Sequence, residues 1–154
     1  MILKRVYVAG PLFSVHEREF LVTLVNKLAK ELSFDPMKDF FLPHRDAGDL
    51  GVAGKTRDLV FHDDLKFLDG AELIVALLDG PDIDSGTALE MGYAHAKGKP
   101  IFGILTDLRK WNGSDLGIIN NMVWGVCDEG KRIHRTVDSL ASDLKNFLTQ
   151  EEDW

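Results

Sequence analysis

The sequence predicts an α/β protein whose parallel five-stranded sheet carries helices on both faces. Short apolar segments alternate with longer segments whose apolar residues recur at helical spacing. One short segment, Leu73–Leu78, is apolar throughout, which is typical of a strand covered on both sides. The chain has 154 residues, and we expect residues 1–154 to form one domain around one core.

A turn signal and a capping signal mark the first strand and the first helix. Arg5–Ala9 is expected to form a buried strand that ends at Gly10-Pro11. Ser14 and Glu17 have the spacing of a capping box at the start of a helix. The helix is expected to bury the apolar residues that recur at its spacing, namely Phe20, Leu21, Leu24, Val25, Leu28 and Leu32.

The middle of the chain predicts a strand, a loop and a helix. Phe40–Leu42 is a short strand candidate that Pro43 stops. The polar, glycine-containing stretch His44–Gly54 is expected to be a loop, and Lys55–Leu68 is expected to be a helix that leads to Leu73–Leu78.

The last part of the chain predicts two further strands and two helices. Thr87–Lys97 is expected to be a helix with Gly98 as its C-cap. Ile101–Leu105 and Met122–Val126 are expected to be the last two strands. A closing helix is expected to start at Thr136 and to bury Val137, Leu140, Leu144 and Phe147.

Composition argues against several classes of function. The net charge of −7 disfavours a general nucleic-acid surface. Cys127 is the only cysteine, so neither a disulfide framework nor a cysteine metal cluster is expected, which fits a reducing cytoplasm. Residues 1–13 do not form the apolar core of a signal peptide, and no segment approaches the roughly 18 apolar residues that span a membrane. We therefore expect a cytoplasmic protein without membrane or nucleic-acid partners.

Two of the predicted strands end in segments that suit a binding site. Gly10–Phe13 follows the first strand, and Asp79–Asp84 follows Leu73–Leu78. The carboxyl ends of parallel strands share one edge of the sheet, and ligands of open α/β sheets bind beyond that edge. We therefore expect both segments to border one site.

Glu90 has two interpretations that the local sequence does not separate. Thr87 and Glu90 have the spacing of a capping box, in which Glu90 would fold back on the start of its own helix. Alternatively, the helix dipole favours an ionised carboxylate in the first turn, and such a group can attack the anomeric carbon of a sugar. Glycosyl transfer of this kind also needs a second carboxyl group as an acid.

Asp84, Asp64 and Tyr7 are the other catalytic candidates. Asp84 lies across one turn from Glu90, and two nearby carboxyl groups push their pKa values apart, leaving one as an acid and one as an anion. Each candidate also has a purely structural interpretation. Asp84 would then be a cap or turn residue, Asp64 a solvated helix residue and Tyr7 a packing residue of the first strand.

One motif-like segment is discounted. Gly51–Thr56 resembles a phosphate-binding loop, but Asp49 stands where its first glycine is required, and no apolar strand runs directly into it. Signatures of zinc hydrolases, paired cysteines and α/β-hydrolases are absent, and the five histidines are not spaced like metal ligands. We expect no metal and no cofactor.

Four segments together resemble the nucleoside 2-deoxyribosyltransferase family. They follow one another in the family's order over nearly the whole chain, and the match is weakest over Asp35–Lys55. The segments are Tyr7–Ser14, Asp63–Leu65, Asp84–Ala94 closed by Gly98-Lys99, and Ile119–Val126. The resemblance implies a flavodoxin-like (Rossmann-like) fold in a homo-oligomer. It also implies an enzyme that exchanges the base of a 2′-deoxynucleoside for a free purine or pyrimidine base.

The resemblance assigns catalytic roles to four residues. Glu90 is implied to be the nucleophile that takes the deoxyribosyl group, and Tyr7 to position it. Asp64 is implied to handle the base and its proton, and Asp84 to bind sugar hydroxyls. A covalent intermediate would let one base leave before the next arrives, which gives ping-pong kinetics.

Further residues are implied to bind the substrate. Phe13 would pack near the base or sugar, and Gly10 and Gly86 would adjoin it. Asn120 and Met122 match a segment that reaches the site of a neighbouring subunit in the family.

Two other functions remain open at this point. A related N-glycosidase would hydrolyse deoxynucleoside 5′-monophosphates, with water in place of the second base. A non-catalytic nucleotide-sensing module could be built on the same fold.

Overall fold

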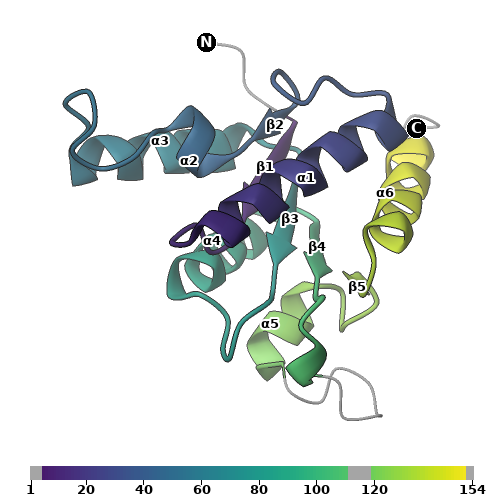
Figure 1. Ribbon diagram of the computed structural model, residues 1–154. Helices are drawn as coiled ribbons and strands as arrows, with labels where there is room; N and C mark the ends of the chain where they lie inside the picture. The colour runs from purple at the N-terminus through teal and green to yellow at the C-terminus, as the bar shows by residue number, and fades with distance from the viewer. Residues whose placement is uncertain (1–4, 111–118, 152–154) are drawn as a thin grey trace.

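The computed structural model describes residues 5–110 and 119–151, and its centre is a five-stranded parallel sheet (Figure 1). The strand order is β2-β1-β3-β4-β5. The strands are β1 (Val6–Ala9), β2 (Phe40–Phe41), β3 (Leu73–Leu77), β4 (Ile101–Ile104) and β5 (Ile133–His134). Every pair is parallel and the order is that of flavodoxin-like sheets, so the predicted fold class is confirmed.

The strand order reverses between β1 and β3, which creates a crevice at their carboxyl ends. Val8 pairs with Val75 and Ala9 with Ala76, so the two strands end level with each other. The turn that begins at Gly10 leaves the sheet against Leu77, because a Cβ atom on Gly10 would lie 3.1 Å from the Leu77 Cβ atom. The two predicted site segments therefore begin at the same edge.

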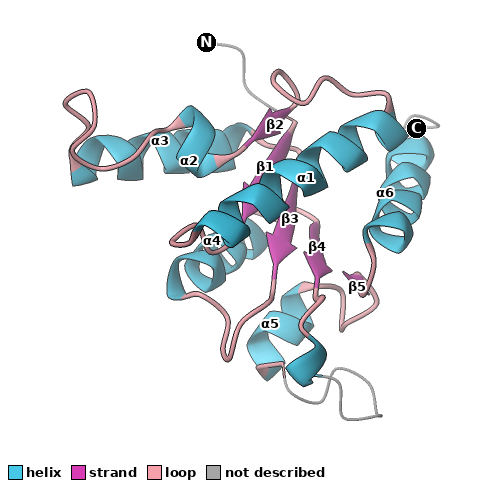
Figure 2. Ribbon diagram, viewed as in Figure 1, coloured by secondary structure: helices cyan, strands magenta, loops and turns pink. Residues whose placement is uncertain are grey.

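Helices cover both faces of the sheet (Figure 2). On one face, α1 (Val15–Leu32) and α6 (Val137–Glu151) pack against each other and against alternate strand residues such as Val8 and Phe102. On the other face, α3 (Arg57–Gly70), α4 (Ser85–Ala96) and α5 (Asn121–Val126) pack on the intervening strand residues, among them Tyr7 and Ile74. This alternation follows from the two-residue period of a strand.

The first helix begins as its sequence predicts. The Ser14 hydroxyl accepts a hydrogen bond from the Glu17 amide, and the Glu17 carboxylate accepts from the amides of Ser14 at 2.7 Å and Phe13 at 2.9 Å. The buried residues Leu21, Leu24, Val25, Leu28 and Ala29 form the inner face of α1. The capping carboxylate thus occupies two amides of the turn after β1.

The segment after β2 differs from the prediction. A short helix, α2 (Pro43–Asp46), begins where a loop was expected, and Leu42 is its N-cap rather than a strand residue. Proline is well suited to the first position of a helix, since its fixed φ is helical and its missing amide hydrogen has no partner there. Arg45 holds the segment in place by donating to the carbonyl oxygens of Phe40 and Pro36.

The prediction of a strand over Met122–Val126 is wrong, because this segment is the helix α5. The Asn120 side chain caps it by accepting a hydrogen bond from the Met122 amide at 2.9 Å. The last strand is β5, which pairs with β4 through Gly103 and Ile133. A short apolar run has no periodicity that separates a strand from a helix. A 3-10 turn, η1 (Leu108–Lys110), precedes the undescribed residues 111–118.

Two core positions are tightly enclosed. Gly103 of β4 faces Leu78, and a Cβ atom on this glycine would lie 2.7 Å from the Leu78 Cδ1 atom. Cys127 follows α5 and is fully buried in the layer that contains α4. Burial raises the pKa of its thiol to about 12.

Candidate active site

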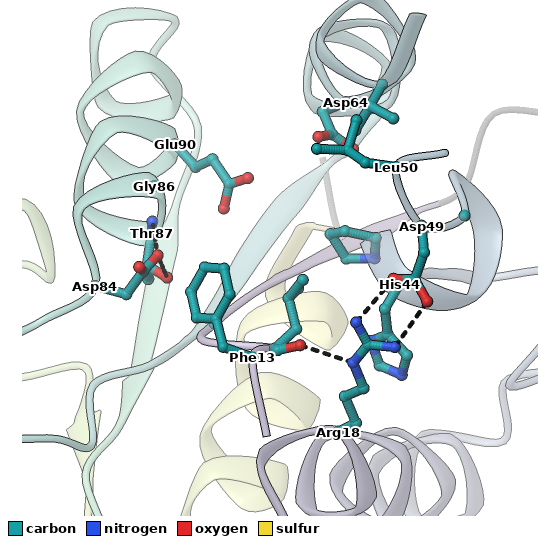
Figure 3. A pocket seen from close by; sticks show the side chains of 15 residues that line it. Phe13, Arg18, His44, Asp49, Leu50, Asp64, Asp84, Gly86, Thr87 and Glu90 are labelled. Carbon is teal, nitrogen blue, oxygen red and sulfur yellow. Dashed lines mark hydrogen bonds and ion pairs between the residues drawn. The ribbon is translucent and has the colours of Figure 1, made fainter. Parts of the chain in front are cut away.

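A cavity of about 350 Å³ opens at the carboxyl ends of β1 and β3 (Figure 3). Its volume lies within the range of small-molecule sites. Nine residues were predicted to form a site, and six of them line this cavity: Gly10, Phe13, Asp64, Asp84, Gly86 and Glu90. The turn after β1 and the helices α3 and α4 therefore converge on one space.

Glu90 is held by Tyr7 and not by the start of its own helix. The Tyr7 hydroxyl donates a hydrogen bond to Glu90 Oε1 at 2.7 Å. Asp84 is the N-cap of α4, since its Oδ2 atom accepts from the Thr87 amide at 2.8 Å and from the Thr87 hydroxyl at 3.1 Å. The capping-box interpretation of Thr87 and Glu90, one of the two left open by the sequence, is therefore wrong, and α4 begins at Ser85. Figure 3 shows the Glu90 carboxyl pointing into the cavity.

The surroundings of Glu90 favour its neutral form. Burial raises the pKa of this carboxyl to about 8, and the nearby carboxyls of Asp64 and Asp84 add to the rise. The hydrogen bond from Tyr7 acts in the opposite direction and lowers the Glu90 pKa. Burial and the charge of Glu90 raise the pKa of Tyr7 far above its ordinary value, so its hydroxyl remains a donor.

Asp64 faces the same cavity from α3. Its Oδ1 atom is buried and has no hydrogen-bond partner among the described residues. Burial, followed by the charge of Asp63, raises the pKa of Asp64 to about 6. The Lys55 ammonium bonds to Asp63 at 2.7 Å and lowers the Asp64 pKa only in part. Asp64 is therefore able to carry a proton near neutral pH.

The wall across the cavity from Glu90 carries groups that the sequence did not point to. Arg18 donates from both terminal nitrogens to Asp49, at 2.9 and 2.7 Å, and from Nε to the Leu12 carbonyl oxygen at 2.7 Å. His44 lies beside this pair, and its Nδ1 atom is buried without a partner among the described residues. Burial and then the charge of Arg18 lower the His44 pKa, so that its ring is neutral at pH 7.

Neither sequence spacing nor a motif marks this wall. Arg18 is one of several charged residues at the start of α1, and its partner Asp49 comes from a glycine-containing loop beyond α2. Asp49 drew attention in the sequence only because it stands where a phosphate-binding loop requires its first glycine. The loop residue Lys55 bonds to Asp63, which agrees with discounting that motif.

Asn120 and Met122 do not line the cavity of their own chain. Asn120 caps α5, and the Met122 side chain is 76% exposed. A second, apolar hollow of about 360 Å³ is lined by residues of α3 and α4, Asp64 and Glu90 among them. Its lining includes Phe61, Leu65, Leu68 and Leu89, of which Phe61 and Leu89 are exposed.

Residues 5–110 and 119–151 contain neither a metal-ligand cluster nor a membrane-spanning helix. No group of three or more His, Cys, Asp or Glu side chains is placed to hold a metal ion. Within the same ranges, no helix combines the length and the apolar character that crossing a lipid bilayer requires.

Comparison with solved structures finds the fold of this chain in other proteins. The chain superposes on a conserved protein from Enterococcus faecalis V583 with a TM-score of 0.77 and 27% identity, over 94% of this chain and 98% of the other. It superposes on a 2-deoxyribosyltransferase of Bacillus psychrosaccharolyticus with a TM-score of 0.67 and 21% identity, over 92% and 90%. A CMP N-glycosidase of Clostridium botulinum gives a TM-score of 0.52 and 20% identity, over 94% and 99%.

Sequence comparison agrees with the superpositions. A curated, uncharacterised protein of Ureaplasma parvum serovar 3 is 31% identical over 93 residues, a match that covers 58% of each chain. The family model described as nucleoside 2-deoxyribosyltransferase matches residues 6–135, which is most of the chain. The chain therefore belongs to the nucleoside 2-deoxyribosyltransferase family.

Proposed function

We propose that this protein exchanges the base of a 2′-deoxynucleoside for a free purine or pyrimidine base through a deoxyribosyl ester on Glu90. The observation that carries the proposal is the placement of Glu90. Its carboxyl is held by the Tyr7 hydroxyl and points into the cavity, where Asp64 supplies a second carboxyl with a raised pKa. A retaining glycosyl transfer needs one ionised and one protonated carboxyl group. Since the Glu90 pKa of about 8 lies above the Asp64 pKa of about 6, the reactive form with Glu90 ionised and Asp64 protonated is the minor one between these values.

In the first step, an ionised Glu90 oxygen bonds to C1′ of the sugar while the N-glycosidic bond breaks. The bonding electron pair leaves with the base, and protonated Asp64 delivers a proton to the base nitrogen. In the second step, a nitrogen of the incoming base bonds to C1′, the ester bond breaks, and Asp64 takes up the proton that the incoming base loses. Carboxylates beside the sugar also stabilise the positive charge that develops on it.

Asp84 and the residues beside it are suited to hold the sugar. One oxygen of Asp84 is used in capping α4, which leaves the other to accept a bond from a sugar hydroxyl. A Cβ atom on Gly86 would lie 3.1 Å from the capping oxygen, so any larger residue would disturb Asp84. Phe13 is 80% exposed at the mouth of the cavity and offers an apolar face to the base or the sugar.

The decisive assay uses deoxyinosine as donor and free adenine as acceptor. Formation of deoxyadenosine and hypoxanthine in equal amounts is expected. A 2-fluoro-2-deoxy nucleoside should add the mass of one fluorodeoxyribosyl group to the protein, and Glu90→Ala should abolish that adduct while it still binds ligand. The absence of an adduct in the parent protein, with ligand binding intact, would indicate a nucleotide-sensing module.

Hydrolysis of deoxynucleoside 5′-monophosphates is the alternative activity, and the turn after β1 argues against it. A phosphate bound at this turn would need free backbone amides. The amides of Phe13 and Ser14 already donate to the Glu17 carboxylate, whose charge would repel a phosphate, and Pro11 has no amide hydrogen. Release of the base without transfer, together with a preference for monophosphates, would establish the hydrolase.

We also propose that the protein is a homo-oligomer whose subunits complete one another's sites through Asn120 and Met122. The exposed Met122, and the apolar hollow beside Asp64 and Glu90, support this proposal. Co-expressed Glu90→Ala and Met122→Ala chains should regain activity, because some mixed sites contain both native residues. Leu108→Ala, which alters a similarly exposed side chain (78%), should remain fully active. A fully active monomer in light scattering would refute shared sites.

A further inference from the structure

The cavity is electrically asymmetric. Glu90 and Asp84 lie on one side and Asp64 on another, whereas Arg18 is the only lysine or arginine among the described lining residues. The Arg18 guanidinium is fixed at the opposite wall by the Leu12 carbonyl oxygen and by both carboxylate oxygens of Asp49. Its donors are therefore presented in one orientation.

The direction of nucleophilic attack places the base at this wall. A nucleophile displaces the leaving group from the opposite face of C1′. If Glu90 approaches C1′ from its side of the cavity, the departing base points away from Glu90. In Figure 3, Arg18, His44 and Asp49 lie across the cavity from Glu90.

The donors of Arg18 suit a particular edge of a base. Three of its five N–H groups are used by Leu12 and Asp49, which leaves one on each terminal nitrogen without a partner in the described part of the chain. Asp49 takes the two N–H groups that lie side by side, so the remaining two diverge and donate singly. One of these N–H groups can donate a single charge-assisted hydrogen bond to the O6 acceptor of a 6-oxopurine. Adenine presents an amino group in place of O6, which would oppose a donor.

We propose that Arg18, oriented by Asp49, is the specificity-determining residue of the base subsite and makes 6-oxopurines the preferred bases. This inference rests on the proposed function. The guanidinium also faces the atoms on which negative charge collects as the glycosidic bond breaks, so it favours departure of the same bases. The neutral His44 ring beside it adds no competing charge.

The test compares hypoxanthine and adenine as acceptors with deoxyguanosine as the common donor. The donor half-reaction cancels in the ratio of the two kcat/KM values for the acceptors. The parent protein should favour hypoxanthine, and Arg18→Met should reduce that preference by roughly 10- to 100-fold, as expected for the loss of one hydrogen bond from a charged donor. Arg18→Lys keeps the charge but loses the planar guanidinium that Leu12 and Asp49 orient, so its preference should fall between those of the other two proteins.

The matched control is Arg5→Met, which breaks a surface pair with Glu72 at almost the same exposure. The side chains are 38% and 51% exposed in that pair, against 37% and 45% for Arg18 and Asp49. The control should keep the base preference of the parent. Equilibrium binding of free hypoxanthine and free adenine to each protein gives a second readout that needs no turnover.

The outcomes separate the inference from the proposed function. If the parent exchanges bases but neither Arg18 variant changes the ratio, the role of Arg18 is refuted and the transferase stands. If no exchange occurs, the proposed function fails, and the free-base binding ratios still decide whether Arg18 selects 6-oxopurines. If Arg18→Met instead lowers only the binding of 5′-monophosphates, Arg18 is a phosphate ligand and the inference is overturned.

Discussion

Replacing Tyr7 by phenylalanine removes one hydroxyl from the candidate site and keeps the ring. The ring lies fully buried against Phe41, with 5.1 Å between centroids, so the variant should fold. Glu90 loses the donor at 2.7 Å that lowers its pKa. A hydrogen bond to a charged group contributes about 1.5–3 kcal/mol, and one pKa unit corresponds to about 1.4 kcal/mol, so the Glu90 pKa should rise by roughly 1–2 units.

The expected change in the pH profile follows from the protonation states that the chemistry needs. The active form has Glu90 ionised and Asp64 protonated, although the Glu90 pKa is about 8 and the Asp64 pKa about 6. The fraction of protein in this form is constant between pH 6 and pH 8 and decreases below and above that range. A plot of kcat/KM against pH should therefore show a plateau with an acidic limb near pH 6 and an alkaline limb near pH 8. In Tyr7→Phe the alkaline limb should move up by roughly 1–2 units and the plateau should fall roughly 10- to 100-fold.

The assay is base exchange followed chromatographically across this pH range. Tyr93→Phe is the matched control, because it keeps the ring and removes a hydroxyl that donates to Asp69 of α3 at 2.9 Å, and neither residue lines the cavity. The control should keep both limbs and the plateau height. An alkaline limb that stays in place or moves down in Tyr7→Phe would refute the view that this hydroxyl tunes the nucleophile.

Four further variants test the energetics of the site and the core. Folding raises the Glu90 pKa from 4.5 to about 8, so the folded protein binds the Glu90 proton more tightly than the unfolded chain does. The contribution of this proton to the free energy of unfolding is complete below pH 4.5 and is lost as the pH rises toward 8. Glu90→Gln should therefore gain thermal stability over the parent at pH 8 but not at pH 4, and equal gains at both would contradict the shift. Gly103→Ala should lower the free energy of unfolding by about 1–3 kcal/mol, because the added methyl group would clash with Leu78. Gly92→Ala should raise the free energy of unfolding by about 0.5–1 kcal/mol, because alanine favours a helix and the space around Gly92 is open. Denaturant titrations measure both changes. Asp84→Asn should keep the helix cap, so its free energy of unfolding should stay within about 0.5 kcal/mol of the parent value. The rate of base exchange should fall, because a carboxylate that binds the sugar is lost. A variant as active as the parent would exclude Asp84 as a sugar ligand.

The order of strands and helices from β1 to β4, apart from the short helix α2, could be predicted because each of these elements depends on local patterns. The continuous apolar run of β3 and the capping box at Ser14 each specify one conformation with few competitors. Met122–Val126 was wrongly predicted to be a strand because its apolar run suits a strand or a helix equally well. Only Val123 of α5 is buried, so the segment has no helical pattern of apolar residues. The real last strand, Ile133–His134, is two residues long and half-buried, so it has no periodicity to detect.

The two walls of the candidate site likewise differ in how far the sequence predicts them. The carboxylates of one wall belong to segments whose spacing carries a signal. The opposite wall depends on Arg18, His44 and Asp49, which come from separate elements and meet only in the folded chain. The role of Glu90 at the start of its helix was also beyond local reasoning, because Asp84 takes the cap and leaves Glu90 to a strand residue distant in sequence.

The burial of Cys127 has a practical consequence for handling the protein. It is the only sulfhydryl of the chain, and its high pKa and lack of exposure should make it inert to maleimides. A cysteine introduced at the exposed Leu108 would then be the sole reactive thiol. A fluorophore or a solid support could be attached there in one orientation, without first removing the native residue.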